Sequence, residues 1–122
     1  MKTYAKGYRF EAELLHFLHG KGFSVIRGPS SGGDLSPVDV VAMKRGLVLA
    51  FECKNWEKKP KLTSDKIKKM KEWCETAGAL GFLTWRNNNQ WIFLRLEDAE
   101  ENRYDDENWF PLENLLKAVD FR

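Results

Sequence analysis

Hydrophobic side chains in the first twenty residues recur at the spacing of an α-helix. The apolar positions that share one helical face are Phe10, Leu14, Phe17 and Leu18. Gly20 and Gly22 follow these positions, and glycine commonly ends a helix. The pattern therefore predicts a helix over residues 4–19.

Three short apolar segments come next, separated by residues that favour turns. The predicted strands cover residues 23–27, 38–44 and 47–54. Arg45 and Gly46 supply a tight turn between the second strand and the third. Because side chains alternate between the two faces of a strand, Glu52 and Lys54 project from the same face as the apolar Val48.

The second half of the chain begins with another amphipathic segment. Thr63 or Ser64 can cap a helix that ends at Gly78. The apolar positions of this helix are Ile67, Met70, Cys74 and Ala77. The remaining predicted elements are strands at residues 79–86 and 90–96, an asparagine turn at 87–89, and a short helix that carries Leu112, Leu115, Leu116 and Val119.

The resulting order, α-β-β-β-α-β-β-α, indicates an α/β fold in a single domain over residues 1–122, with a five-stranded sheet flanked by helices. A hydrophobic fraction of 43% and a charged fraction of 31% are typical of a globular domain and exclude wholesale disorder. The chain has no run of eighteen apolar residues and no signal-peptide pattern, so we expect no membrane partner and a cytoplasmic location.

The two cysteines, Cys53 and Cys74, are far apart and lack the spacing of a CxxC or Cys/His motif. This spacing excludes a zinc knuckle and disfavours a disulfide scaffold. We expect both side chains to be small buried hydrophobic groups.

The net charge of +2 conceals an uneven distribution. Residues 1–71 carry fifteen lysines and arginines against seven acidic residues, whereas residues 72–122 carry five against eleven. A basic half on a nearly neutral chain is typical of a face that binds a polyanion such as nucleic acid. A solvated lysine-rich helix would produce the same count, and the charges leave both alternatives open.

Three charged residues fall on the second and third predicted strands. If these strands form a hairpin around Arg45 and Gly46, Asp39 and Glu52 lie side by side, because each is six residues from the turn. Two adjacent carboxylates repel each other unless a divalent cation bridges them. The alternative is a structural ion-pair cluster of Asp39, Glu52 and Lys54, and the spacing does not decide between the two.

An aspartate that opens one strand, followed by Glu-x-Lys on the next, resembles the PD-(D/E)xK motif of the restriction-endonuclease-like nucleases. The literal Pro-Asp pair is absent, because Val38 separates Pro37 from Asp39. The flanking segments are more specific: Lys6-Gly7 with Glu11, Gly22-Phe23 with Val25 and Arg27, a Ser/Gly loop, Val38 to Ala42, and Phe51 to Lys54. This ordered series is similar to that of the archaeal-type Holliday junction resolvases, which also occur in viruses and phages, where they act in the host cytoplasm.

The resemblance implies a restriction-endonuclease-like fold with a mixed sheet and a DNA endonuclease that acts in recombination and repair. It implies that Asp39 and Glu52 bind Mg²⁺, for which Mn²⁺ can substitute, and that the carbonyl of Cys53 adds a ligand. Glu11 matches the third acidic residue of the family. Lys54 would orient the attacking water and neutralise charge on the phosphate. Without the resemblance, Glu11 is an ordinary exposed helical glutamate.

The resemblance also implies residues that contact the DNA backbone. The Ser/Gly loop of the family carries a serine needed for cleavage, which matches Ser31 or Ser30 here, with Ser31 favoured. Lys6 and Arg27 would clamp phosphates near the cut, or else are ordinary surface cations. The further lysines that would follow the phosphate backbone, together with Lys66 and Lys71, are Lys58, Lys59, Lys61, Lys68 and Lys69.

A four-way DNA junction is resolved by two symmetric nicks, so a chain with one active site is expected to act as a homodimer. Trp73 and Ala77, on the predicted helix that ends at Gly78, are the expected centre of the dimer interface. Further candidates for the interface are Trp91, Phe93, Trp109 and Phe110, although a small core also needs its aromatic side chains.

Two other functions fit the same residues. One is a different nuclease of this superfamily, of the Mrr-like or nicking restriction type. The other is a DNA-binding module without catalysis, which would be expected to have lost an acidic residue or the lysine. Since Glu11, Asp39, Glu52 and Lys54 are all present, a metal-dependent junction resolvase is the favoured prediction.

Overall fold

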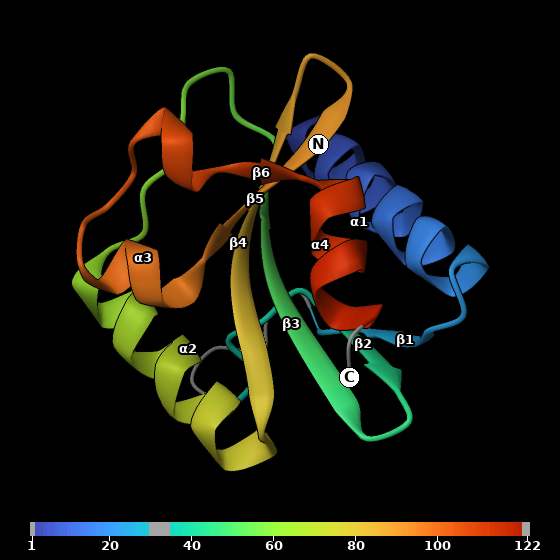
Figure 1. Ribbon diagram of the computed structural model, residues 1–122. Coiled ribbons are helices and arrows are strands. Elements are labelled where there is room, and N and C mark those ends of the chain that lie inside the picture. The colour runs from blue at the N-terminus through green and yellow to red at the C-terminus, as the bar shows by residue number, and fades with distance from the viewer. Residues whose placement is uncertain (1, 30–34, 121–122) are drawn as a thin grey trace.

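The computed structural model describes residues 2–29 and 35–120, and within these a six-stranded sheet lies at the centre (Figure 1). The strands are β1 (Ser24–Arg27), β2 (Val40–Lys44), β3 (Leu47–Lys54), β4 (Ala79–Asn87), β5 (Gln90–Arg95) and β6 (Phe110–Pro111). The helices are α1 (Lys2–Gly20), α2 (Ser64–Ala77), α3 (Leu96–Glu100) and α4 (Leu112–Asp120), with a 3₁₀ turn at Asp106–Asn108. None of the helices in these residues is long and apolar enough to span a bilayer.

The strands follow one another in the sheet in sequence order. Neighbouring strands are antiparallel except β3 and β4, which are parallel and are connected through α2. The predicted mixed sheet flanked by helices is confirmed. The predicted number of five strands is wrong, because the two residues of β6 pair with Ile92 and Phe93 of β5. A two-residue strand that ends in proline has no periodicity from which it could be predicted.

Helices cover both faces of the sheet (Figure 1). Helices α1 and α4 pack on one face, where Leu14, Leu18 and Leu115 are fully or almost fully buried against Phe51 and Phe93. Helices α2 and α3 pack on the other face. Both faces of β3 are therefore core, which explains its nearly continuous apolar sequence and makes the charged Glu52 exceptional.

The hairpin between β2 and β3 has the predicted register. Arg45 and Gly46 both have positive φ, 49° and 85°, as a two-residue turn between twisted strands requires. Val40 therefore pairs with Phe51. One more hydrogen bond, from the Asp39 N–H to the Phe51 carbonyl at 2.8 Å, extends the pairing beyond Val40. Asp39, the residue before β2, therefore lies beside Glu52.

The two ends of α2 have the predicted caps. Thr63 Oγ1 accepts a hydrogen bond from the Lys66 N–H at 3.1 Å, and Gly78 ends the helix with φ 69°. The cap sets the position of the first turn of α2, which carries Lys66. Cys74, further along α2, is buried as predicted, while Cys53 on β3 is partly buried.

Candidate active site

Asp39 is positioned by the ends of two strands. The Gly28 N–H donates to the Asp39 carbonyl at 2.7 Å, and Asp39 Oδ2 accepts from the Cys53 N–H at 2.8 Å. This arrangement needs glycine at position 28, since a Cβ there would lie 2.1 Å from the Val38 carbonyl oxygen. The aspartate is therefore held from both β1 and β3.

Glu52 is a buried carboxylate between two ammonium groups. Its exposed fraction is 5%. Lys54 Nζ, two residues further along β3, lies 3.3 Å from Oε2, and Lys66 Nζ of α2 lies 3.2 Å from Oε1. These ion pairs compensate the charge of Glu52, but Oε1 has no hydrogen bond of good geometry within the described residues.

Glu11 reaches the same end of the sheet from α1. Its Oε1 lies 3.6 Å from Nε of Arg27, the last residue of β1, and both side chains are about three-quarters buried. The structure therefore brings together the predicted acidic residues Glu11, Asp39 and Glu52, with Lys54 and Arg27 beside them.

The electrostatics of the cluster reflect this crowding. Burial and, to a lesser extent, the negative charge of Asp39 raise the pKa of Glu11 from its usual 4.5 to about 7, although Arg27 opposes the shift. Burial also raises the pKa of Glu52, again with Asp39 contributing, and Lys66 and Lys54 oppose it. The negative charge of Asp39 therefore disfavours the ionised forms of both Glu11 and Glu52.

Such a cluster supplies oxygen donors for a divalent cation, although no group of three Asp, Glu, His or Cys side chains in the described residues is already arranged to hold a metal ion. Its donors are hard carboxylate oxygens, which suit Mg²⁺, and the buried Oε1 of Glu52 has an incomplete set of partners. A bound cation would offset both the burial and the negative charge of Asp39, which together raise the two glutamate pKa values. The chemistry of these donors therefore suits the predicted metal, and its binding by them stays a prediction.

Cys53 lies between these groups in sequence and in space. Its N–H holds Asp39. Burial raises the pKa of the Cys53 thiol well above its usual range, with Asp39, Glu11 and Glu52 adding to the effect. The thiol is therefore neutral at physiological pH and a poor metal ligand, which leaves the backbone carbonyl as the group that Cys53 can offer.

The predicted DNA-binding residues are in different situations. Ser30 and Ser31 lie outside the described residues, as does the side chain of Lys6. Lys58, Lys61 and Lys68 are exposed, whereas Lys69 pairs with Asp65 at 2.9 Å.

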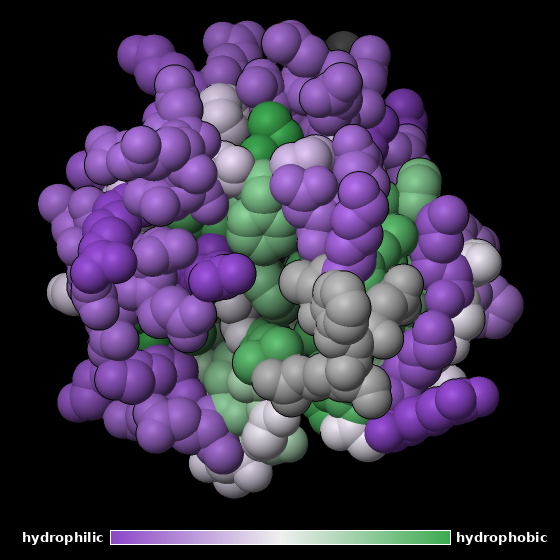
Figure 2. Space-filling model, viewed as in Figure 1, coloured by the Kyte–Doolittle hydropathy of each residue, from purple (hydrophilic) through white to green (hydrophobic). Residues whose placement is uncertain are grey.

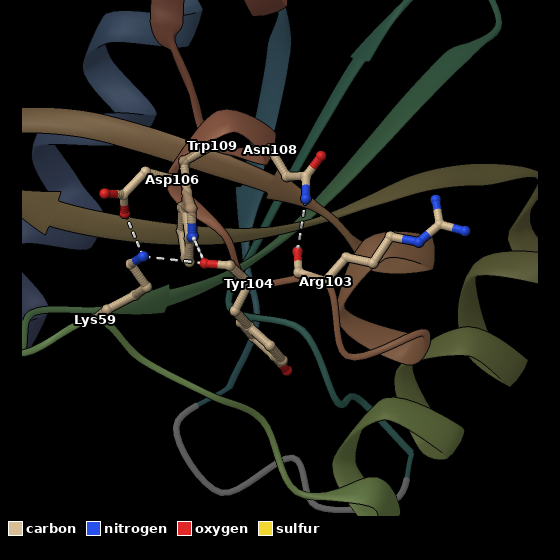
Figure 3. A network of polar contacts seen from close by, with 6 residues as sticks. All are labelled: Lys59, Arg103, Tyr104, Asp106, Asn108 and Trp109. Carbon is tan, nitrogen blue, oxygen red and sulfur yellow. Dashed lines mark hydrogen bonds and ion pairs between the residues drawn. The ribbon is translucent and has the colours of Figure 1, made fainter.

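Lys59 belongs to a network that joins residues 55–63 to the segment after α3 (Figure 3). Its ammonium donates to the Tyr104 carbonyl at 3.0 Å and pairs with Asp106. Trp109 Nε1 donates to the same carbonyl, also at 3.0 Å. Lys59 therefore has a structural role that its place in a basic run did not indicate.

The predicted interface residues differ in exposure. Trp73 is partly buried against the core below α2, and Ala77 is exposed. Trp91 and Phe93 are buried, at 7% and 0% exposure, so the alternative that they belong to the core is confirmed. Trp109 and Phe110 are partly buried beside core clusters.

Sequence reasoning missed three residues at this site. Lys66 was counted in the basic run, but it binds Glu52. Gly28 was not singled out, although its missing side chain admits the segment that carries Asp39. Trp56 was not considered, and its ring lies 5.1 Å from the Lys54 ammonium. The contacts of Lys66 and Gly28 join separate segments of the chain, whereas Trp56 is two residues from Lys54, and the glycine that follows β1 was the clue that the sequence did offer.

A separate groove with an apolar floor and charged rims lies on the face shown in Figure 2, between α2 and α3 on one side and α4 on the other. Its volume is about 730 Å³, and its apolar lining includes Leu80, Phe82 and Phe110. None of the carboxylates described above lines this groove. The groove is therefore distinct from the candidate active site.

Comparison with known proteins places this arrangement in a family. A family model described as "Archaeal holliday junction resolvase (hjc)" matches residues 2–121. A crossover junction endodeoxyribonuclease Hje of Saccharolobus solfataricus is 30% identical over 95% of this chain and 90% of its own length. A crossover junction endodeoxyribonuclease Hjc of Sulfolobus acidocaldarius is 31% identical over 99% of this chain and 87% of its own length.

A solved structure supports the same assignment. The Holliday junction resolvase Hjc of Archaeoglobus fulgidus superposes with a TM-score of 0.66 and 29% sequence identity, covering 73% of this chain and 75% of that one. The family expected from the sequence motifs is confirmed. The chain belongs to the archaeal Holliday junction resolvase family, a family of crossover junction endodeoxyribonucleases.

Proposed function

We propose that this chain resolves four-way DNA junctions by paired, metal-dependent hydrolysis of phosphodiester bonds. The observation that carries the proposal is the meeting of Glu11, Asp39, Glu52 and Lys54 at one end of the sheet. Family membership supports the substrate, and the mutual repulsion of the carboxylates supports the need for a cation.

Glu11, Asp39 and Glu52 are the residues that would hold Mg²⁺ or Mn²⁺, with the Cys53 carbonyl as a further ligand. When bound, the cation supplies an activated water and stabilises charge on the leaving oxygen. Lys54 orients the attacking water and neutralises charge that develops on the phosphate. Lys66 pairs with Glu52 and opposes the rise in the pKa of that buried carboxylate.

The DNA backbone would be held by cations around this site. Arg27 lies beside Glu11 and is suited to a phosphate next to the cut, and Ser31, Ser30 and Lys6 are proposed to contribute on the basis of the family motif. The exposed Lys58, Lys61 and Lys68 are further phosphate contacts.

A homodimer would bring two such sites to one junction. Next to α2, the sheet face formed by β1, β2 and β3 carries apolar side chains that are incompletely covered; we call Ile26, Met43, Val48 and Trp73 the Trp73 surface. Ile26 is 56% exposed and pairs with the buried Val41, on the same face as Met43 and Val48. Burial of this surface against a second copy, with Ala77 at its edge, supports the proposed interface.

The direct test is incubation with a synthetic four-way junction and with linear duplex of the same sequence, each with and without Mg²⁺. We expect paired nicks in the junction, in Mg²⁺. Asp39→Asn should bind the junction but cleave about 10²-fold more slowly or worse, while Glu113→Gln on α4 serves as the matched control. Equal cleavage of linear duplex would indicate a different nuclease of this fold, and binding without cleavage would indicate a non-catalytic module.

A further inference from the structure

Trp56 is a large apolar side chain at the edge of the candidate active site. Four large hydrophobic residues of the described chain are exposed: Phe17, Ile26, Leu35 and Trp56. The Trp56 side chain is 48% exposed, and the Lys54 ammonium lies over its ring, 5.1 Å from the centroid. Since the same ammonium lies 3.3 Å from Glu52, a single side chain separates the indole from the carboxylates.

The backbone of Trp56 is held by a hydrogen bond from β4. Trp85 Nε1, on β4, donates to the Trp56 carbonyl at 2.8 Å. Trp85 is 9% exposed and makes an edge-to-face contact with Trp109, at 5.6 Å between ring centroids. The backbone of Trp56 is therefore hydrogen-bonded to a packed indole, although Trp56 follows the end of β3 in a segment without regular structure.

The rest of residues 55–63 is fastened in the same way. The Lys59 ammonium binds the Tyr104 carbonyl and Asp106 (Figure 3). The Leu62 N–H donates to Tyr104 Oη at 3.2 Å. Pro60 between them is fully buried. A segment pinned at three points loses little conformational entropy when it binds a ligand, so the exposed indole is preorganised.

The charges around Trp56 select the ligand. Lys54 lies over the ring, and the exposed Lys58 follows two residues later. An exposed aromatic ring among lysines is the combination by which proteins bind single nucleotides, because the ring stacks on a base while the cations hold its phosphates. Since the neighbouring carboxylates are assigned to cutting a DNA backbone, the occupant that fits this ring is a nucleobase of the substrate.

We propose that Trp56 stacks on the nucleobase next to the phosphate that is cut, an inference that rests on the proposed function. Within a duplex both faces of a base are covered by its neighbours, so an indole gains nothing unless the base is unstacked. At a branch point a base can expose one face. Trp56 therefore adds selectivity for branched over linear DNA without reading the sequence, since every base has a face on which an indole can stack.

The test uses four-way junctions that carry 2-aminopurine, a fluorescent base quenched by stacking, on either side of the mapped cleavage position or far out in one arm. Binding is measured in EDTA, so that no strand is cut. Wild type, Trp56→Phe, Trp56→Leu and the control Phe17→Leu are compared, because phenylalanine keeps an aromatic face and leucine keeps only the apolar volume.

We expect the fluorescence of the probe beside the cleavage position to change when wild type, Trp56→Phe or Phe17→Leu binds, but not when Trp56→Leu binds. The distant probe should not respond to any of them. Trp56→Leu should bind the junction about 10-fold more weakly, with little change in its affinity for linear duplex.

An equal fluorescence change with Trp56→Leu and wild type would overturn the stacking role and leave the proposed function intact. If Trp56→Leu cleaves more slowly but has unchanged affinity and an unchanged fluorescence response, the indole acts by positioning the Lys54 ammonium. That result would also overturn the stacking role. A wild-type protein that fails to cleave any junction in Mg²⁺ would overturn the proposed function and this inference together.

Discussion

The ammonium of Lys66 lies 3.2 Å from Glu52 Oε1, while Lys54 occupies the other oxygen at 3.3 Å. The two lysines come from different elements, the first turn of α2 and the end of β3. The pairing therefore ties α2, whose first turn is set by the Thr63 cap, to the carboxylate that is proposed to bind the cation.

Replacing Lys66 should lower the unfolding free energy, because Glu52 then keeps its buried charge with one ion-pair partner fewer. In Lys66→Met, Lys54 alone opposes the desolvation of the carboxylate, so the metal-free protein should lose about 1–2 kcal/mol of unfolding free energy at pH 8. At pH 5 the loss should be smaller, because the raised pKa of Glu52 lets the carboxyl take up a proton. Urea unfolding in EDTA measures both values. Lys68→Met, which removes an exposed lysine of the same helix, is the control, and equal losses in both variants would refute the role given to Lys66.

Gly28→Ala should disturb the position of Asp39. The new Cβ would lie 2.1 Å from the Val38 carbonyl oxygen, so the backbone on one side must move. We expect a loss of about 1–3 kcal/mol in unfolding free energy and at least a 10-fold slower cleavage of the junction. Gly20→Ala is the matched control, because a Cβ at Gly20 meets no atom within 4 Å. Wild-type cleavage by Gly28→Ala would show that Asp39 is positioned without this close approach.

The stability of the metal-free protein should depend on Glu11 in a defined pH window. Because its pKa is raised from 4.5 to about 7, the folded state holds a proton that the unfolded state releases between these values, and stability falls as the pH rises through this window. Glu11→Gln lacks the buried charge. The unfolding free energy of this variant should exceed that of wild type by on the order of 1 kcal/mol at pH 8, which corresponds to about 4 °C in Tm. At pH 4 the two proteins should be equally stable.

Thermal unfolding in EDTA at the two pH values provides the measurement, with Glu113→Gln as the exposed control. In Mg²⁺ the order should reverse, because the cation stabilises wild type and finds one ligand fewer in the variant. A gain for Glu11→Gln that does not change between pH 4 and pH 8 would contradict the buried-charge explanation.

Local patterns in the sequence were sufficient to predict much of the fold. The turn at Arg45 and Gly46 determined the register, and from it the neighbourhood of Asp39 and Glu52. Thr63 and Gly78 marked the ends of α2 because caps act within one helical turn. These features depend on residues close together in the chain, which is why they could be found without a structure.

The features that were not predicted depend on contacts between distant segments. Lys66 and Glu52 are fourteen residues apart and meet because α2 crosses over the sheet. Helix α3 has five residues, too few for a helical period, and β6 forms because β5 is beside it. Lys59 resembles its basic neighbours in sequence, and its partners, Tyr104 and Asp106, lie more than forty residues away.

The exposed lysines should control the salt dependence of DNA binding. Replacing Lys58, Lys61 and Lys68 together by alanine should lower the slope of log affinity against log salt by about three, one for each lost phosphate contact. Lys59 and Lys69 are left in place, because both have acidic partners in the fold. The control replaces the exposed Lys21 and Lys117, which lie outside the basic run. If the triple variant has the slope of wild type, these lysines form a solvated surface and not a phosphate track.

The Trp73 surface should hold the active dimer together. Two nicks in one junction require two active sites, and each chain of this length carries one set of catalytic residues. Trp73 is partly buried against the core beneath α2, so its remaining face and the exposed Ile26 are available to a second copy. Burying an indole and its neighbours can contribute roughly 2 kcal/mol or more per protomer, enough for a charge at its centre to disrupt the pairing.

Trp73→Glu should therefore yield folded monomers that bind junctions weakly and nick one strand at a time, as sedimentation at micromolar concentration and the pattern of nicks will report. Phe17→Glu places the same charge on an exposed aromatic site of α1, the helix that packs on the opposite face of the sheet, and should remain dimeric. A variant Trp73→Glu that remains dimeric would show that the interface lies elsewhere, and the groove between α2, α3 and α4 would be the next surface to mutate. A wild-type protein that sediments as a monomer would instead count against paired cleavage, because one protomer has a single active site for two strands.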